Sequence, residues 1–208
     1  MASLRDNLNR FGWMKLPYRF PEPSLAELEK LGQNCGVGER LADIQAIADR
    51  LPIEFKALIS QYGFSQDPLR GIWFYKDSTK NWSLPWHQDR SFPMGEKSED
   101  PDLTNWTKKN DQWHCEPSLA QLKRHAFVHL AFDPMNATSG QLELLEKSHL
   151  KGKIPQDDIK NIVLNHRKIV QNLERGEALL VSALTLHRSS SNKSRQPRRA
   201  LRLDFLQP

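Results

Sequence analysis

The feature that most constrains the fold is a series of short β-forming runs that begins near Leu69 and continues almost to the end of the chain. Each run is rich in aromatic, aliphatic or β-branched residues, and turn-forming residues separate it from the next. The runs are residues 72–75, 126–132, 141–145, 169–170, 178–181 and 200–205. Because helical patterns precede these runs instead of alternating with them, the sequence predicts an antiparallel sheet or barrel backed by helices, not a parallel βαβ fold.

The first third of the chain carries the helical patterns. Ser24 and Glu27 form a capping-box pattern, which predicts a helix near residues 25–31. Apolar residues then recur at helical spacing over residues 38–62, and Pro52 divides this segment into two helices. We therefore expect three N-terminal helices to pack against the sheet.

The composition is that of an ordinary globular protein, with 38% hydrophobic and 26% charged residues in a chain of 208. We find no repeat and no low-complexity linker, so we expect a single domain over residues 1–208. The longest apolar run, residues 178–186, is shorter than the roughly 20 residues that a membrane-spanning helix needs. The N-terminus lacks the apolar stretch of a signal peptide, and two cysteines do not make a disulfide framework. We therefore expect a cytoplasmic protein.

The formal net charge is +5, and much of the excess lies in residues 188–202. Such a cluster is typical of a solvated face, and it is also compatible with binding of nucleic acid or of a smaller anion. Because the cluster follows a candidate metal ligand directly, we favour a small-molecule anion over nucleic acid.

The sharpest local feature is the tetrapeptide Trp86-His87-Gln88-Asp89. In an extended chain, residues two apart project to the same face, so His87 and Asp89 would present a nitrogen and an oxygen ligand to one point. Two such ligands and a further histidine make the facial triad of non-haem iron(II) oxygenases. Taken alone, a His-x-Asp pair occurs by chance in many proteins, and a polar strand end stays open as the alternative.

The third ligand must come from the other histidines of the chain. These are His114, His125, His129, His149, His166 and His187. His187 differs from the rest because it ends the apolar run of residues 178–186, and a turn and a new strand follow it. A histidine at a strand end, facing the mouth of a barrel, can reach a metal without leaving buried backbone groups unpaired.

The strand after that turn has one polar and one apolar face. Its even positions begin with Arg198 and continue through Arg202 to Asp204, whereas the odd positions beyond Arg199 are apolar. In a helix-backed barrel the apolar face packs under the helices, so Arg198 would point into the barrel. There its guanidinium could bind a carboxylate through two hydrogen bonds, although a surface arginine in a basic turn is the alternative.

Three blocks of sequence carry a resemblance to a known family. They are residues 81–89, which end in His87-Gln88-Asp89, residues 130–149, which end in Ser148-His149, and residues 176–199, which contain His187, Ser189 and Arg198. They resemble the phytanoyl-CoA dioxygenase family of iron(II)/2-oxoglutarate oxygenases, in particular a bacterial branch of unassigned substrate. In that family an arginine follows the distal histidine by eleven residues, as Arg198 follows His187. The resemblance covers Phe74 to Phe205.

The resemblance implies a mainly β fold with helices, a double-stranded β-helix of the jelly-roll, cupin-like kind. It implies that His87, Asp89 and His187 bind iron(II). It also implies that Arg198 binds the distal carboxylate of the co-substrate 2-oxoglutarate, with Ser189 as a hydroxyl partner of the same group.

This sequence departs from the family pattern at several places. Glu146-Lys147-Ser148-His149 stands where the family has Pro-Gly-Ser-His, and Arg188 stands where a glycine commonly follows the distal histidine. These departures leave the shape of the substrate pocket open. Asp89 is informative, since halogenating relatives carry a small residue at this position; its presence favours hydroxylation or a related oxidation.

Several further residues are candidates for lesser roles. Lys76 and Gln88 lie close to the metal segment in sequence, and either could contact the co-substrate. We expect residues 90–116 to form a long loop that acts as a lid. His114 and Trp113 in this loop, and His129 on the strand over residues 124–132, are candidate substrate contacts. A loop-stabilising histidine and a buried tryptophan are the alternatives.

The predicted function is that of an enzyme which uses iron(II), 2-oxoglutarate and O2 to oxidise a small-molecule substrate, with release of succinate and CO2. A non-oxidative metal-dependent cupin, an isomerase or a hydrolase, would use the same ligands without needing Arg198. A basic module that binds anions or nucleic acid would need neither the metal ligands nor Arg198. The identity of the substrate and the oligomeric state do not follow from the sequence.

Overall fold

The computed structural model describes residues 4–33, 35–109 and 111–208, and its framework is three antiparallel sheets. The large sheet contains, in spatial order, β1 (Trp13–Lys15), β11 (Ala178–Ser182), β8 (His125–Ala131), β13 (Arg198–Leu206), β3 (Arg70–Lys76) and β2 (Glu39–Leu41). The small sheet contains β10 (Lys168–Val170), β9 (Leu142–Leu145), β12 (His187–Ser189) and β4 (Leu84–His87). The third sheet, here called the lid sheet, contains β5 (Phe92–Met94), β7 (Gln112–Glu116) and β6 (Thr104–Lys109).

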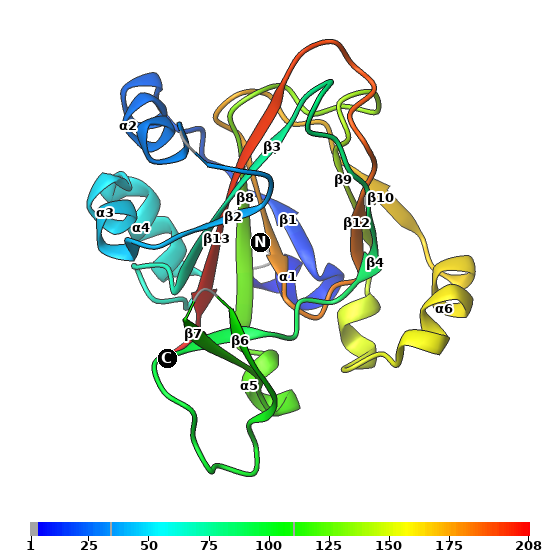
Figure 1. The fold of residues 1–208 in the computed structure, drawn as a ribbon. Coiled ribbons are helices and arrows are strands. Elements are labelled where there is room, and N and C mark those ends of the chain that lie inside the picture. Colours follow the sequence, from blue (N-terminus) through cyan, green and yellow to red (C-terminus); the bar gives the residue numbers. More distant parts are fainter. Residues whose placement is uncertain (1–3, 34, 110) are drawn as a thin grey trace.

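The large and small sheets face each other, and helices from the first third of the chain cover the outer face of the large sheet (Figure 1). The helices are α1 (Leu4–Phe11), α2 (Glu22–Gly32), α3 (Ile44–Arg50), α4 (Ile53–Gln61), α5 (Leu119–Leu122) and α6 (Ile159–Asn165), with short 3₁₀ turns at Ser148–Lys151 and Gln156–Asp158. This arrangement is the double-stranded β-helix, jelly-roll and cupin-like, backed by N-terminal helices, that the sequence predicts. None of the helices in the described ranges is long and apolar enough to cross a membrane.

The main core lies between the N-terminal helices and the large sheet. Leu28, Phe55 and Ile59 of the helices are fully buried there against Leu201 and Leu203 of β13. Burying one such side chain contributes about 1.5–3 kcal/mol to folding, so this layer holds the large sheet firmly in place. The sheet in turn fixes the side chains on its other face, which line the interior of the barrel.

Strand β13 shows the alternation that the sequence predicts. Leu201 and Leu203 pack under the helices, whereas Arg198, Arg202 and Asp204 lie buried on the opposite face. These polar residues therefore point into the barrel, between the large and the small sheet. The prediction of a polar interior face on this strand is confirmed.

The predicted helices form, but two of their boundaries are wrong. Helix α2 begins at Glu22, its N-cap is Pro21 without a side-chain hydrogen bond, and Ser24 lies inside the helix. Pro23, in the first turn, needs no hydrogen-bond donor there, so the helix starts earlier than the capping-box pattern indicates. Leu41, counted in the helical pattern, belongs to β2, where pairing with the edge of the large sheet overrides the local spacing.

The prediction that residues 90–116 form a loop is also wrong, because this segment contains the lid sheet. Its strands are short and mostly polar; the buried positions are Phe92 in β5 and His114 and Cys115 in β7. Cross-strand contacts stabilise the pairing, among them the edge-on packing of Trp106 against Trp113 at 6.2 Å between ring centroids. A two-sided polar sheet carries little apolar alternation, so its strands are hard to recognise from sequence.

Candidate metal centre

Strands β4 and β12 of the small sheet bring the two predicted metal-binding histidines together. His87 ends β4, His187 begins β12, and the two residues are direct partners in the antiparallel register. Asp89 lies two residues beyond His87, where its backbone N–H donates to the carbonyl of Ala183 at 3.0 Å. The sheet pairing therefore fixes two of the side chains, and a backbone hydrogen bond holds the third.

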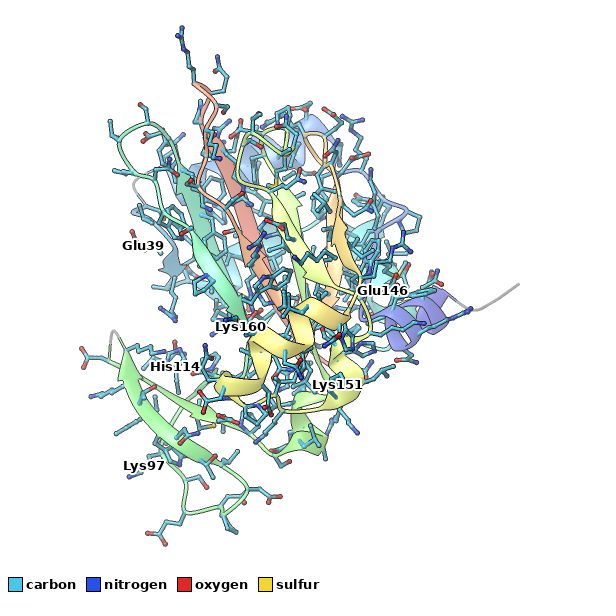
Figure 2. All side chains as sticks on the ribbon, turned by 90° about the vertical axis from the view of Figure 1, so that its right-hand side faces the viewer. Glu39, Lys97, His114, Glu146, Lys151 and Lys160 are labelled. Atoms are coloured by element: carbon cyan, nitrogen blue, oxygen red, sulfur yellow. The ribbon has the colours of Figure 1, made fainter. Side chains whose placement is uncertain are left out.

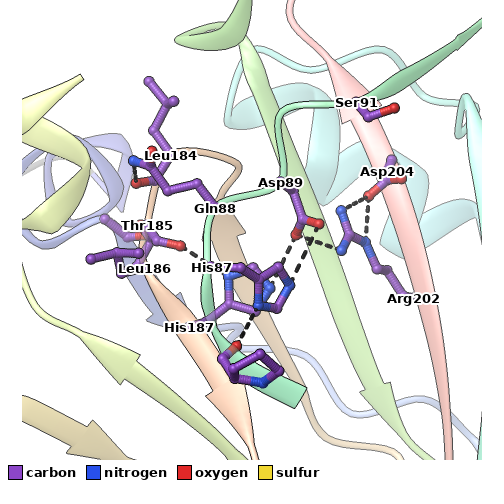
Figure 3. A network of polar contacts seen from close by, with 12 residues as sticks. His87, Gln88, Asp89, Ser91, Leu184, Thr185, Leu186, His187, Arg202 and Asp204 are labelled. Atoms are coloured by element: carbon purple, nitrogen blue, oxygen red, sulfur yellow. Dashed lines mark hydrogen bonds and ion pairs between the residues drawn. The ribbon is translucent and has the colours of Figure 1, made fainter. Parts of the chain in front are cut away.

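The three side chains converge on one point (Figure 3). His187 Nε2 lies 3.1 Å from Asp89 Oδ2, and His87 Nε2 lies 3.9 Å from Asp89 Oδ1. One ligand atom from each residue lies within 4.8 Å of the others, and this is the one such group of three among the residues that the structure describes. None of the other five candidate histidines reaches this group.

Both imidazole rings are held by backbone carbonyls. His87 Nδ1 lies 2.8 Å from the Pro85 carbonyl, and His187 Nδ1 lies 2.9 Å from the Thr185 carbonyl. If each Nδ1 carries the proton and donates it, each Nε2 turns its lone pair toward Asp89. Metal-binding histidines in proteins are typically oriented in this way.

The charge state of the group suits a divalent cation. Burial, and then the neighbouring His187, lower the pKa of His87 to about 4, so its ring is neutral at pH 7. Burial opposes ionisation of Asp89, but Arg202 and His187 outweigh it and hold the pKa of this carboxyl well below its usual value. Two imidazoles and one carboxylate on one side of a point are the donor set of a non-haem iron(II) centre with open positions, so these residues fit that metal.

Arg202 contacts the same carboxylate and was not predicted from the sequence. Its Nη1 donates to Asp89 Oδ2 at 2.5 Å, and its Nε donates to Asp204 Oδ1 at 2.7 Å (Figure 3). Asp204 also accepts from Arg70. The guanidinium lies over the Phe127 ring, 4.1 Å from its centroid. The polar alternation of β13 was the signal for this residue, since it places Arg202 on the same face as Arg198.

A second group of cations lies deeper in the barrel, in a small cavity of about 30 Å³ whose wall includes Lys76, Ser189 and Arg198. Lys76 Nζ donates to Ser189 Oγ at 2.9 Å and to the Ser190 carbonyl at 2.7 Å. The structure thus brings the predicted residues Lys76, Ser189 and Arg198 together.

The two cations of this cavity are ready to receive an anion. Burial lowers the pKa of Arg198 to about 10; burial and then the charge of Arg198 lower that of Lys76 to about 7. Arg198 is 2% exposed, and its Nε has no hydrogen-bond partner among the described residues. A buried donor without an acceptor, beside a second cation, fits a carboxylate ligand.

His129 lies beside Arg198 and forms part of the wall of this cavity. Its Nε2 is 3.0 Å from Arg198 Nη2, and its side chain is 3% exposed. Burial and the charges of Arg198 and Arg202 hold its pKa well below the usual value, so the neutral ring accepts a hydrogen bond from the guanidinium. The structure therefore places His129 as a partner of Arg198, where we had expected a substrate contact.

Gln88 does not face the cavity, contrary to the predicted co-substrate contact. Its amide nitrogen donates to the carbonyls of Gly152 and Leu184, and its amide oxygen accepts from Ile154 N–H. All of these partners are backbone groups of neighbouring segments. Gln88 therefore anchors the end of β4, because strand alternation turns it away from His87 and Asp89.

The remaining candidates lie in the lid sheet, which extends beyond the barrel (Figure 2). His114 is fully buried, with Nδ1 facing the Gln112 carbonyl at 3.1 Å. Trp113 is half-buried and packs against Trp106, with Lys97 Nζ 5.8 Å from its ring centroid. Neither is in the metal group, and Trp113 is held by contacts within its own sheet.

Ser148 belongs to the segment Glu146-Lys147-Ser148-His149, which replaces the Pro-Gly-Ser-His motif of the family. Its Oγ accepts from Leu186 N–H at 2.8 Å and donates to the Leu145 carbonyl at 2.7 Å. It thereby ties the end of β9 to the residue before His187. Lys147, at the usual glycine position, adopts a left-handed conformation with φ 63°, which explains why glycine is common there.

Comparison with solved structures shows the same fold in three other proteins, one of them described as a non-haem enzyme. The non-haem α-ketoglutarate-dependent epimerase SnoN from nogalamycin biosynthesis has a TM-score of 0.70 at 13% identity over 98% of this chain and 79% of its own. EctD from S. alaskensis, solved in its apo form, gives 0.70 at 14% identity over 99% and 76%. AviO1 from Streptomyces viridochromogenes Tue57 gives 0.69 at 12% identity over 100% and 95%.

Sequence comparison agrees with the structural one. No curated protein matches the sequence. The family model of phytanoyl-CoA dioxygenase (PhyH) matches residues 43–200, which is more than half of the chain and includes every residue of the candidate metal centre. The chain therefore belongs to the phytanoyl-CoA dioxygenase family.

Proposed function

We propose that this protein is a non-haem iron(II)- and 2-oxoglutarate-dependent oxygenase that hydroxylates a small-molecule substrate. The observation that carries the proposal is the convergence of His87, Asp89 and His187, with the unsatisfied Arg198 in the same barrel. Membership of the phytanoyl-CoA dioxygenase family and the 2-oxoglutarate dependence of SnoN support it. EctD has also been solved with 2-oxoglutarate and 5-hydroxyectoine, at a TM-score of 0.69 and 14% identity.

In this proposal His87, Asp89 and His187 hold iron(II) through two imidazole nitrogens and one carboxylate oxygen. The metal supplies the oxygen chemistry that amino-acid side chains lack. The overall reaction consumes 2-oxoglutarate, O2 and a C–H bond of the substrate. It releases succinate and CO2, and one oxygen atom ends in the new hydroxyl group.

The protein's own part is to bind and orient the co-substrate. Arg198 and Lys76 neutralise the distal carboxylate of 2-oxoglutarate, and Ser189 adds a hydroxyl group. His129 keeps the Arg198 guanidinium in position through its hydrogen bond. Phe74, Phe127 and Leu142 complete the wall and exclude water, which strengthens the ion pairs inside.

The proposal extends to the whole chain and to its surroundings. Strand β1 near the N-terminus and β13 at the C-terminus belong to one sheet, which supports residues 1–208 as a single oxygenase domain. Cys35 and Cys115 are free thiols, as expected in the reducing cytoplasm. We propose a small molecule as the partner, and neither a membrane nor a nucleic acid.

The proposal is tested by measuring succinate release from 2-oxoglutarate in the presence of iron(II) and O2. The native protein should form succinate slowly without substrate and faster with a true substrate. His187→Ala should abolish this release, and Arg198→Ala should lower it strongly unless 2-oxoglutarate is supplied in large excess. Arg195→Ala removes an exposed positive charge from the same turn and should leave it unchanged. Turnover of a substrate that is independent of 2-oxoglutarate and insensitive to Arg198→Ala would support a non-oxidative cupin instead.

A further inference from the structure

A cavity of about 390 Å³ lies between the edge of the large sheet and the lid sheet, and the proposed reaction does not yet use it. Its wall includes three cationic side chains from three separate strands: Arg40 of β2, Arg70 of β3 and Lys109 of β6. One carboxylate, that of Asp111, also lines it.

The positive charge in this cavity is largely uncompensated. Arg70 pairs with Asp204, and Asp111 pairs with Lys108 at 3.2 Å while almost fully exposed. Arg40 has no hydrogen-bond or ion-pair partner among the described residues, and its Nε is buried without one. Burial, then the charges of Arg70 and Arg202, lower the pKa of Arg40. Burial, and then the charges of Arg40 and Arg70, lower the pKa of Lys109.

Strand register places this cavity beside the metal centre. Arg40 is opposite Ile72 on β3, Ile72 is opposite Arg202 on β13, and Arg202 is opposite His129 on β8. Residues paired in this way share one face of the sheet, so Arg40 lies on the interior face. It is two strands from Arg202, about 10 Å along the sheet. Arg202 itself contacts the metal-binding carboxylate of Asp89.

The rest of the wall is suited to an organic ligand. Leu41, Ile44, Leu69 and Met94 supply apolar surface beside the cations. His114 is fully buried in the lid sheet, and its Nε2 has no hydrogen-bond partner among the described residues. Burial is the main cause that lowers its pKa, and the charges of Arg40, Arg70 and Lys109 contribute, so this ring is near the same cations.

We propose that this cavity binds the anionic group of the substrate, a carboxylate or a phosphate ester, through Arg40 and Lys109. The inference rests on the proposed function, because it names the class of molecule that the metal centre oxidises. An oxyanion held at Arg40 would leave a carbon chain of several atoms to reach the metal along the interior face. Lid and barrel each contribute one of the two cations, so the bound anion would also hold the lid sheet against the barrel.

The test is isothermal titration calorimetry with two probes, acetate for a carboxylate and methyl phosphate for a phosphate ester. The protein is loaded with nickel(II) and saturated with 2-oxoglutarate, so that the cavity of Arg198 and Lys76 is filled. We expect at least one probe to bind, and the tighter one identifies the anion. Arg40→Gln and Lys109→Gln should each weaken binding about tenfold, the loss of one hydrogen bond to a charged group.

Lys160→Gln is the control, since it removes the same charge from an exposed position on α6 that does not line the cavity. It should change the affinity less than twofold. Arg40→Gln should raise the melting temperature in the absence of anion, because it relieves repulsion among like charges; a purely structural arginine would lower it. Binding of neither probe, or equal affinity in the native protein and both cavity variants, would overturn the inference.

The outcome is separable from that of the proposed function. The iron(II) and 2-oxoglutarate complex should form normally in Arg40→Gln and Lys109→Gln, because neither residue lines the cavity of Arg198. If that complex forms and the probes do not bind, the substrate class is wrong while the oxygenase assignment stands. If the complex fails to form in the native protein, the proposed function itself is wrong.

Discussion

The two ends of the barrel interior differ in how they are built. At the end with Lys76 and Arg198, the charged side chains are buried and strands of both main sheets supply the wall. At the other end Arg40 is half-buried, Lys109 is exposed and Arg70 is buried, and the lid sheet supplies part of the wall. A buried, rigid site suits a constant co-substrate, whereas an open site with a separate lid suits a substrate that varies within a family. In the proposed function the metal centre serves both sites.

Removal of a proposed metal ligand should have the largest effect, because in our proposal both cavities act together with the metal centre. Asp89→Ala should lower nickel(II) affinity at least a hundredfold, since the carboxylate is the anionic ligand of the group. It also leaves Arg202 with one partner fewer in a buried position, which should destabilise the fold by about 3 kcal/mol. Metal competition assays and chemical denaturation measure the two effects. Asp157→Ala, at an exposed acid, should change neither.

The buried end is tested most directly by Arg198→Ala. We expect KM for 2-oxoglutarate to rise about a hundredfold, because a bidentate, charge-assisted contact is lost in a water-excluded cavity. Metal affinity should remain within twofold of the native value. Steady-state kinetics with varied 2-oxoglutarate, alongside metal titration, separates the two. An unchanged KM would mean that the co-substrate does not bind at Arg198.

Arg202 connects the two ends through its contact with Asp89. Arg202→Gln should lower metal affinity about tenfold, the lower part of the range for residues that orient a metal ligand. Arg202 also lines the cavity of Arg198, so the affinity for 2-oxoglutarate at saturating metal should fall, but far less than in Arg198→Ala. Arg202→Lys should restore part of the metal affinity, because a single N–H donor can still reach the carboxylate. Equal metal affinity in all three proteins would contradict this role.

The pH dependence of 2-oxoglutarate binding should follow Lys76, whose pKa is lowered to about 7. As the pH rises through 7 in the free protein, Lys76 loses its charge, so 2-oxoglutarate affinity should fall several-fold between pH 6 and 9. Stability should change in the opposite sense: the unfolded chain keeps the proton up to about pH 10.4, so the contribution of Lys76 to stability rises between pH 7 and 10. Lys76→Met should flatten both profiles.

The smallest effect is expected at the lid. Trp113→Ala removes packing within the lid sheet, so metal and 2-oxoglutarate affinities should stay within twofold of the native values. The stability of the whole protein should fall by no more than about 1 kcal/mol, because the ring is only half-buried. Binding titrations and thermal denaturation measure these. A large loss of 2-oxoglutarate affinity would mean that the two ends are not independent.

The parts that could be predicted from sequence are those in which spacing and burial act together. The β-forming runs appear as strands because their apolar faces pack under helices, and the eleven-residue spacing from His187 to Arg198 singled out one histidine of six. The geometry agrees with that choice, since His187 is the direct partner of His87 in the small sheet.

The parts that could not be predicted depend on contacts between distant segments. Strand alternation placed Arg202 on the polar face with Arg198, but its contact with Asp89 could not be predicted, because the two residues are 113 positions apart. Gln88 looked like a co-substrate contact until its three backbone partners fixed it elsewhere. The lid sheet was missed because its strands lack apolar alternation. Contacts between the paired strands stabilise it instead. Sequence patterns do not carry such long-range pairings.

The central claim is that His87, Asp89 and His187 hold iron(II) while Arg198 anchors 2-oxoglutarate beside it. The most direct test is an anaerobic titration of the protein with iron(II) and 2-oxoglutarate, followed by visible absorption. A metal-to-ligand charge-transfer band should appear only when both are present, and it should be absent in His187→Ala. In Arg198→Ala it should need far more 2-oxoglutarate. A folded, iron-loaded native protein without this band would contradict the claim.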